Sequence, residues 1–237
     1  MSKIRSVSVI IPVLHEEDTI NSAIRALRTH QPVGLCEIIV VDGSPGGETL
    51  AALEDRDVKQ VLSPRGRGCQ MNEGARRAAG EILLFLHADT TLPPGGLERL
   101  VSAMDTGAFV GGAFDLAIDS EAPSMKLIAW VACARSRLTR LPYGDQALFF
   151  EREHFRAMDG FREIPIMEDV DLMRRIKKTA GRICILPEKV STSPRRWKEE
   201  GVVYCTLRNW VLVTLFFLGV SPEKLASFYR EASKRRP

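Results

Sequence analysis

SVSVIIPVL, residues 6–14, is the stretch that decides the fold, because it is a short β-branched, apolar run closed by turn and polar residues. Such a run predicts a buried strand. The residues that follow, 15–30, begin with acids that suit a first helical turn and then place Ile20, Ile24 and Leu27 at helical spacing. A buried strand followed by a helix is the unit from which parallel sheets are built.

The same alternation continues through residue 90. It predicts strands at 36–44, 58–63 and 81–90 and helices at 47–55 and 68–80. Parallel strands joined by right-handed helical crossovers form a doubly wound sheet. The first ninety residues therefore predict this architecture.

Beyond residue 90 the pattern is less regular. It predicts helices at 93–104, 124–138 and 166–181, strands at 109–118, 144–153 and 182–188, and closing helices at 200–220 and 221–236. No linker or repeat divides the chain. We therefore predict one α/β domain over residues 1–237, with a single doubly wound, mostly parallel sheet and C-terminal helices.

Composition excludes several classes of protein. With 45% hydrophobic and 27% charged residues, the chain has the make-up of a folded globular protein rather than a disordered one. Its five cysteines are odd in number and contain no CxxC pair, which argues against a disulfide framework and a zinc site. The N-terminus lacks a signal-peptide pattern, so we expect a cytoplasmic protein.

The positive charge is concentrated near the C-terminus. Residues 195–237 carry nine Lys and Arg against four acids, in a chain whose net charge is +3. A solvated face is the simplest interpretation, and no nucleic-acid partner is expected. The apolar stretch 202–220 is divided by Arg208 and is shorter than the roughly 20 residues that span a membrane. A buried helix, a homodimer and peripheral contact with the inner face of a membrane stay open.

Acidic and metal-binding residues follow the predicted strands. Glu16, Asp42, His87 and Asp89 come directly after apolar runs, and the carboxyl ends of parallel strands meet at one edge of a sheet. Converging carboxylates repel one another unless cations or hydrogen-bond donors offset them. The chain has no glycine-rich phosphate loop. If a diphosphate binds here, we expect a divalent ion, Mg²⁺ or Mn²⁺, to neutralise it, and Arg67 to donate charge-assisted hydrogen bonds to its oxygens.

Several segments resemble the family 2 glycosyltransferases with the A-type fold. SVSVIIPVLHEEDTI is similar to that family's opening strand and IPxYNEE motif, and EIIVVDGSPGGET to its VVDDGSxD turn, with one acid missing. HADT is similar to the D-x-D motif, with His87 in place of the first Asp. GDQALFF, PIMEDVDL and SPRRW resemble the acceptor-side strand, the ED dipeptide and an Arg-Trp pair. The sequences of these motifs are most similar to those of a small bacterial subgroup of soluble family 2 enzymes.

The resemblance implies a donor site in residues 1–90 and an acceptor and catalytic half in residues 91–199, followed by C-terminal helices at 200–237. The implied nucleotide contacts are Pro12, Leu14, Glu16, Asp42 and Arg67. The implied metal ligands are Asp89 and His87, and the residues near acceptor or diphosphate are Asp145, Arg196 and Trp197.

The ED dipeptide is implied to supply the catalytic base. We expect Asp169 to take the proton of an acceptor hydroxyl, with Glu168 beside it, in a metal-dependent and inverting transfer from a nucleotide-sugar donor. The donor sugar, the base and the acceptor stay open. Both acids also suit the positive end of a helix dipole, so a structural role is the competing interpretation.

Two other functions are compatible with the sequence. A sugar-phosphate nucleotidyltransferase is expected to carry a GxGTRL-type loop after its first strand, and PVLHEEDT does not match it. A noncatalytic nucleotide-sugar-binding protein agrees with the shortened DGS turn and with His87 in the metal motif.

Overall fold

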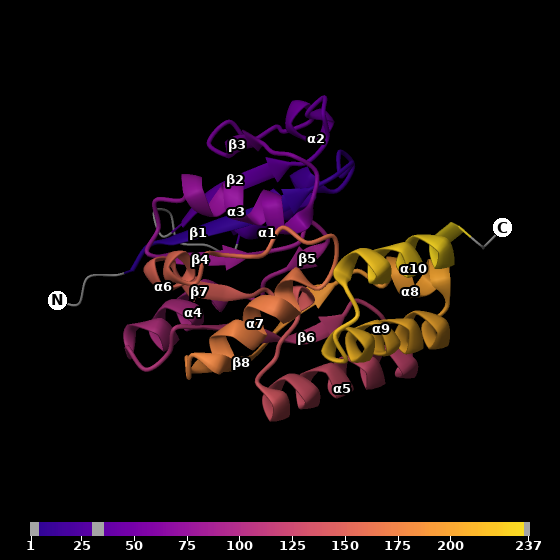
Figure 1. Cartoon of the computed structure of the whole chain (residues 1–237). Coiled ribbons are helices and arrows are strands. Elements are labelled where there is room, and N and C mark those ends of the chain that lie inside the picture. The colour runs from indigo at the N-terminus through magenta and orange to yellow at the C-terminus, as the bar shows by residue number, and fades with distance from the viewer. Residues whose placement is uncertain (1–4, 30–35, 235–237) are drawn as a thin grey trace.

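A central sheet with helices on both sides forms the core of the molecule (Figure 1). The computed structural model describes residues 5–29 and 36–234. The strands lie in the order β3-β2-β1-β4-β7-β6-β8-β5. Their bounds are β1 Val7–Val13, β2 Cys36–Asp42, β3 Lys59–Leu62, β4 Ile82–Phe85, β5 Thr90–Thr91, β6 Gly111–Ile118, β7 Phe149–Glu151 and β8 Ile183–Thr192.

The helices connect these strands and close the chain. Their bounds are α1 Ile20–Thr29, α2 Glu48–Ala51, α3 Arg67–Arg77, α4 Gly96–Asp105, α5 Pro123–Thr139, α6 Arg152–Ala157, α7 Glu168–Lys178, α8 Arg195–Glu200, α9 Val202–Phe217 and α10 Pro222–Lys234. The prediction of an α/β fold with a doubly wound sheet and C-terminal helices is confirmed. Helices α6 and α8 are additions that the sequence pattern did not predict.

Strand directions divide the sheet into two parts. β1 is parallel to both β2 and β4, and β2 is parallel to β3. Further along, β6 is parallel to β8, but β7 is antiparallel to its neighbours β4 and β6, and β5 is antiparallel to β8. All the longer strands therefore run in one direction, and their carboxyl ends share one edge of the sheet.

The two faces of the sheet hold separate hydrophobic layers. Val9 and Ile11 of β1 pack into one layer with residues of α1, α4 and α5. Ile10, between them, packs into the other layer with residues of α3, α6 and α7. Burying a side chain of this size contributes about 1.5–3 kcal/mol. Because β1 buries side chains in both layers, it must be apolar on both of its faces, which explains its continuous apolar run.

Helix α1 begins later than the sequence predicts. His15 has a left-handed backbone with φ 56°, and Glu16 O accepts hydrogen bonds from Thr19 N at 3.1 Å and Ile20 N at 3.0 Å. The acids at 16–18 therefore form a turn ahead of the helix, whose own first turn contains none. The prediction that they occupy the first helical turn is wrong by about one turn.

The predicted strand at 144–153 is also corrected. Gly144–Gln146 form a 3₁₀ turn, which ends at Ala147 with a left-handed φ of 49°. Only Phe149–Glu151 pair in the sheet, and α6 follows at once. The side chain of Gln146 explains the turn, because its amide donates to Phe114 O at 3.0 Å and to the Ser136 hydroxyl at 3.1 Å.

The C-terminal helices lie together at one end of the molecule, where α9 and α10 run beside each other near α5 (Figure 1). Leu212 and Phe216 of α9 pack with Leu225 of α10 and with Val170 of α7. Within residues 5–29 and 36–234, no helix has the length and apolar character to cross a membrane.

Candidate active site

Asp42 shapes the turn at the end of β2. Its side chain is fully buried. Oδ1 accepts a hydrogen bond from Ser44 N at 2.8 Å, and Oδ2 accepts one from Thr49 N at 3.0 Å. Such bonds satisfy a buried carboxylate, and they show that Asp42 holds the turn after β2 in shape. A direct contact between Asp42 and the nucleotide stays a prediction.

Gln70 ties the ends of β1 and β2 together, a role that the sequence did not reveal. Its Nε2 donates to Val13 O at 2.6 Å and to Val41 O at 2.9 Å from within helix α3. Gly43 is needed beside it, since a Cβ there would lie 2.8 Å from Gln70 Cδ. No sequence signal distinguishes a helical glutamine with this role from an exposed one.

The other predicted donor-side residues lie at the same edge. Pro12 and Leu14 are half-buried at the end of β1. The Glu16 carboxylate accepts a hydrogen bond from the Thr19 hydroxyl at 2.7 Å and another from the Arg195 guanidinium at 3.3 Å. Arg195 begins α8, so the C-terminal part of the chain reaches back to the turn after β1.

The two acids at the start of α7 point toward different partners. Glu168 is buried, and its Oε1 lies 3.5 Å from Nη1 of Arg67, at the start of α3. Burial raises the pKa of Glu168, although the charge of Arg67 opposes the shift. Asp169 instead accepts hydrogen bonds from Gly144 N at 2.6 Å and from Val170 N at 2.7 Å. Glu168 thus faces an arginine, whereas Asp169 holds the 3₁₀ turn.

His87, Gly144 and Asp169 meet at one point. A Cβ on Gly144 would lie 3.3 Å from Asp169 Oδ2 and 3.4 Å from His87 Nε2. Burial lowers the pKa of His87 to about 3, and the positive charges of Arg67 and Arg196 add to the effect. The imidazole is therefore neutral near pH 7 and has a nitrogen lone pair available for a ligand.

Asp145 has an acceptor position that no described residue uses. Its Oδ1 is buried and receives no hydrogen bond from the described part of the chain. Burial raises the pKa of Asp145, and the charge of Asp169 adds to this, whereas Arg135 and Arg196 oppose it. A buried carboxylate oxygen without a donor is costly for the fold, so it points to a hydroxyl or another donor from a ligand.

Arg196 and Trp197 belong to the first turn of α8 but have different surroundings. Arg196 is exposed and close enough to influence both His87 and Asp145 electrostatically. Trp197 is half-buried and packs against the hydrophobic cluster of Ile118, Met125 and Ala129. These contacts favour a packing role for Trp197 over the expected contact with the acceptor or diphosphate.

Asp89 and His87 form at most a partial metal site. Within the described residues, no group of three or more His, Cys, Asp or Glu side chains is arranged to hold an ion. Asp89 is half-buried, and Thr90 Oγ1 lies 3.4 Å from its Oδ1. One carboxylate with a neutral imidazole fits an ion whose remaining ligands are diphosphate oxygens and water, and the imidazole suits Mn²⁺ better than Mg²⁺.

Sequence comparisons connect the chain to glycosyltransferases. A profile of "Glycosyl transferase family 2" matches residues 8–162. An uncharacterized glycosyltransferase of Mycobacterium tuberculosis (strain H37Rv) is 29% identical over 104 residues, 44% of this chain and 45% of the relative. Undecaprenyl-phosphate 4-deoxy-4-formamido-L-arabinose transferase of Proteus mirabilis is 32% identical over 122 residues, 46% of this chain and 37% of the relative. The matches thus span less than half of each relative's length.

Solved structures share the fold at low identity. A mannosyltransferase from Pyrobaculum calidifontis, in complex with GDP-Man and Mn²⁺, has a TM-score of 0.61 at 20% identity, covering 80% of this chain and 57% of its own. TarS of S. aureus, in complex with UDP-GlcNAc, has a TM-score of 0.62 at 19% identity, covering 79% of this chain and 58% of its own. The predicted A-type fold is confirmed.

Proposed function

Because this chain belongs to glycosyl transferase family 2, we propose that it transfers a sugar from a nucleoside diphosphate donor to an acceptor hydroxyl. The observation that carries the proposal is the meeting of Asp145, Asp169 and His87 beside Arg67 at the carboxyl edge of the sheet. These residues come from four separate segments of the chain. Their convergence joins a hydrogen-bond acceptor without a donor, a candidate base and a cation in one place.

The donor occupies the side of the site formed by Pro12, Leu14 and Glu16. The turn held by Asp42 and the β1–β2 connection held by Gln70 set the shape of this side. Arg67 and Arg196 lie where they can donate charge-assisted hydrogen bonds to the diphosphate. Asp89 and His87 would hold a divalent ion there, Mn²⁺ or Mg²⁺, which neutralises charge on the leaving diphosphate when bound.

Asp169 acts as the general base. It accepts the proton of the acceptor hydroxyl while that oxygen forms a bond to the anomeric carbon and the bond from this carbon to the diphosphate oxygen breaks. A single displacement of this kind inverts the anomeric configuration. Asp145 Oδ1, which has no donor within the described residues, accepts a hydrogen bond from a hydroxyl of the acceptor or the sugar.

One observation favours a noncatalytic sugar-nucleotide-binding role as the second candidate. Both oxygens of Asp169 already accept backbone hydrogen bonds, from Gly144 and Val170. A carboxylate used only to fix the 3₁₀ turn against α7 would show the same contacts. The two functions differ in whether the donor is consumed.

The experiment is to incubate the protein with a panel of nucleotide sugars and Mn²⁺ or Mg²⁺, and to measure nucleoside diphosphate release with candidate acceptors and with water. We expect release in the parent protein, and loss of metal-dependent donor binding in Asp89→Ala. Pyrophosphate formation from a nucleoside triphosphate and a sugar phosphate would indicate a nucleotidyltransferase instead. Donor binding without consumption would favour the noncatalytic role.

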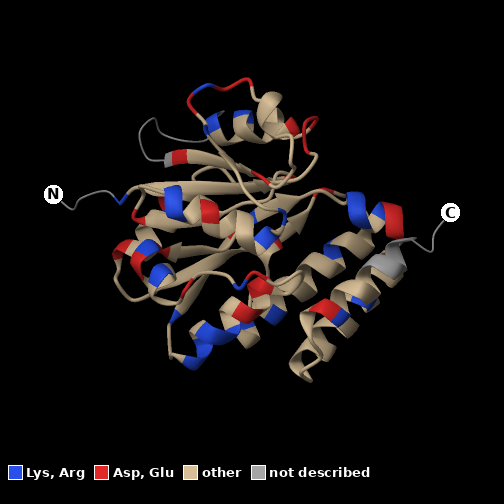
Figure 2. Cartoon of the chain, turned by 45° about the horizontal axis from the view of Figure 1, so that its top comes forward, with Lys and Arg blue, Asp and Glu red and all other residues tan. Residues whose placement is uncertain are grey.

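We also propose that α9 brings the protein to the inner face of a membrane. Val203, Leu207, Trp210, Val211 and Phe217 are exposed at helical spacing on one face of α9. The only charged residue of this helix is Arg208, which pairs with Glu200 at 2.5 Å. Figure 2 shows that the C-terminal helices are mostly tan, with few charged positions. An uncharged apolar stripe with tryptophan is typical of helices that lie in the membrane interface.

Charge ahead of α9 supports this orientation. Arg195, Arg196 and Lys198 of α8 are exposed there and outnumber the acids Glu199 and Glu200, whereas at the start of α10 Lys224 is offset by Glu223. Leu127 and Trp130 of α5 are exposed too, and α5 contacts the start of α9 through Met125, Ala129 and Val202. Basic groups that flank an apolar face favour anionic lipid over neutral lipid.

Vesicle flotation tests the membrane proposal. The parent protein is expected to float with phosphatidylglycerol vesicles and to be released by salt more readily than by dilution. Leu207→Ser with Trp210→Ser should abolish flotation, while Leu62→Ser, at an exposed apolar residue of β3, should not. A parent that stays with the soluble fraction but forms a dimer that the double variant dissociates would assign the face to homodimerisation instead.

A further inference from the structure

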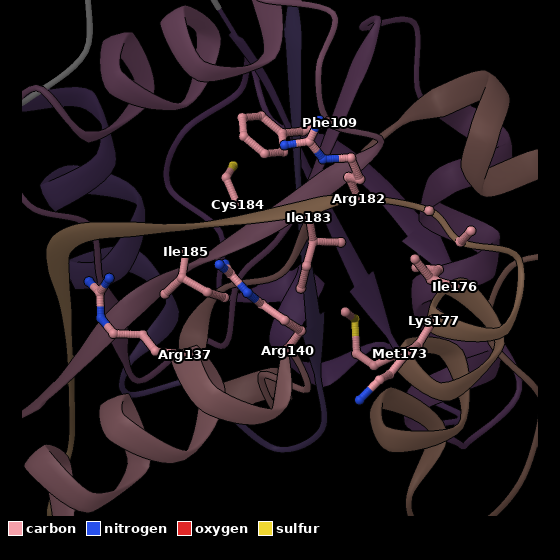
Figure 3. Close-up of a pocket in the computed structure, with 12 residues that line it drawn as sticks. Phe109, Arg137, Arg140, Met173, Ile176, Lys177, Arg182, Ile183, Cys184 and Ile185 are labelled. Atoms are coloured by element: carbon pink, nitrogen blue, oxygen red, sulfur yellow. The ribbon is translucent and has the colours of Figure 1, made fainter.

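A cavity lies away from the candidate active site, between the C-terminal ends of α5 and α7 and the start of β8 (Figure 3). Its volume is about 550 Å³, within the range of about 300–1,000 Å³ that small-molecule sites occupy. Four cationic side chains line it: Arg137, Arg140, Lys177 and Arg182. No aspartate or glutamate is among its lining residues within the described chain.

Three of these cations have no anionic partner within the described residues, and two of the three, Arg140 and Arg182, also lack a hydrogen-bond acceptor there. Arg137 pairs with Asp115, which lies outside the cavity lining, at 2.8 Å, and Lys177 Nζ donates to Thr139 O at 3.1 Å. The Arg140 guanidinium makes no ion pair or hydrogen bond with any residue the structure describes, and Arg182 only stacks 5.7 Å from the ring centroid of Phe109. Two guanidinium groups thus remain available to an anion.

The rest of the cavity is apolar. Ile183 and Ile185 of β8 and Met173 of α7 line it beside Phe109, and Figure 3 shows these side chains among the four cations. Met173 is 1% exposed, and Ile183 and Ile185 are 7% and 8% exposed, so these side chains form a packed floor that offers a ligand its outer edges together with the half-buried Phe109. An organic anion can bury an apolar body against this floor while its charged group reaches the arginines.

The cavity is too far from the donor side to belong to it. β6 and β8 pair in parallel from Gly111 and Ile183, beside the cavity, to Ile118 and Thr192. Thr192 pairs with Thr90, the residue after Asp89. Seven steps along β6 at about 3.3 Å per residue separate these two ends by roughly 23 Å.

We propose that this cavity is a second ligand site, specific for a small organic phosphate that carries an apolar body. Guanidinium groups suit phosphate because their planar donors match its oxygens in paired hydrogen bonds. A concave site of this volume favours a free small molecule over a lipid headgroup that remains in its bilayer. The inference is independent of the proposed sugar transfer, because it uses none of the residues assigned to that reaction.

The test uses n-octyl phosphate as the probe, below the concentration at which it aggregates. Inorganic phosphate and n-octanol serve as controls for its charged part and its apolar part. Isothermal titration calorimetry of the full chain is expected to give one site for octyl phosphate and much weaker binding of either half. Arg140→Gln with Arg182→Gln should weaken octyl phosphate binding by about tenfold or more, because the change removes both guanidinium groups that have no partner in the described structure. Arg56→Gln with Lys126→Gln removes the same charge from exposed positions and should leave binding unchanged.

Thermal unfolding of both double variants separates lost binding from lost folding. We expect small shifts in melting temperature, because the two positions in each variant are exposed.

Equal binding by the parent and the Arg140/Arg182 variant would overturn the proposal. Octanol binding as tight as octyl phosphate would overturn its anion specificity, and inorganic phosphate binding as tight would overturn the role of the apolar surface. Saturating octyl phosphate should not displace a nucleoside diphosphate, and competition between them would assign the probe to the donor side. Phosphatidylglycerol vesicles that bind through Arg140 and Arg182 more tightly than octyl phosphate would contradict a free ligand.

Discussion

The donor side and the acceptor side of the candidate active site use their polar groups in opposite ways. On the donor side, Asp42 and Gln70 are buried and spend their hydrogen-bonding capacity on backbone groups. On the acceptor side, Asp145 keeps an oxygen without a donor in the described structure. The difference teaches that conspicuous acids need not share one role: Asp42 holds a turn, whereas Asp145 keeps an acceptor position that we propose a substrate hydroxyl fills.

The largest expected effect is on the acceptor side. Asp169→Asn should lower turnover about 10²- to 10⁴-fold, because a base of this kind contributes that much to proton transfer. Donor affinity should change little. Glu168→Gln should lower turnover less, because Glu168 faces Arg67 rather than Gly144.

Steady-state turnover and donor titrations of both variants measure this effect. Near-normal turnover in Asp169→Asn with a large loss in Glu168→Gln would transfer the role of base to Glu168. Normal turnover in both variants would remove Glu168 and Asp169 from the mechanism and leave them a structural role at the start of α7.

A smaller effect is expected on the donor side, in stability. Gln70→Leu removes two buried hydrogen bonds and leaves Val13 O and Val41 O with fewer donors. We expect the free energy of unfolding to fall by about 2–4 kcal/mol. Gln60→Leu, at an exposed residue of β3, is the matched control and should change it by less than about 0.5 kcal/mol. Urea unfolding of the two variants gives both values, and equal stabilities would mean that Gln70 does not hold the edge together.

The smallest expected effect concerns pH. Burial lowers the pKa of His87 to about 3 in the folded protein, from an ordinary value of 6.5. The unfolded chain therefore binds the proton more tightly, so this residue lowers stability progressively as pH falls from 6.5 toward 3. His87→Gln, which does not titrate, should lose less thermal stability between pH 7 and pH 5 than the parent. Melting temperatures in chelator at both pH values test this, and identical losses would place His87 in a more solvated setting.

The sequence predicted the donor side's strands better than its contacts. The apolar runs ending at Val13, Asp42 and Phe85 identified the parallel strands, because burial on both faces leaves a continuous hydrophobic signal. The hydrogen bonds by which Asp42 holds its turn were not predicted, because a buried turn acid and a ligand-binding acid look alike in one sequence. Gln70 gave no signal at all, since its partners are carbonyls of distant strands.

On the acceptor side the sequence located the acids and misjudged the backbone. The segment GDQALFF looked like one strand, but its first three residues form the 3₁₀ turn that contacts Asp169. Short antiparallel strands such as β7 carry too few residues for a clear period, and tertiary contacts from Gln146 decide the turn. The cationic cavity was invisible in advance, because its four charges come from α5, α7 and the segments around them.

Asp145→Asn tests the contrast between the two sides most directly, with turnover and melting temperature measured on the same preparation at pH 7. Burial raises the pKa of Asp145, so the folded protein holds the proton more tightly than the unfolded chain, and ionisation above the unfolded pKa costs stability. The neutral variant should therefore melt at the same or a higher temperature than the parent while turnover falls. A lower melting temperature with normal turnover would contradict the account, because Asp145 would then hold the fold as Asp42 does.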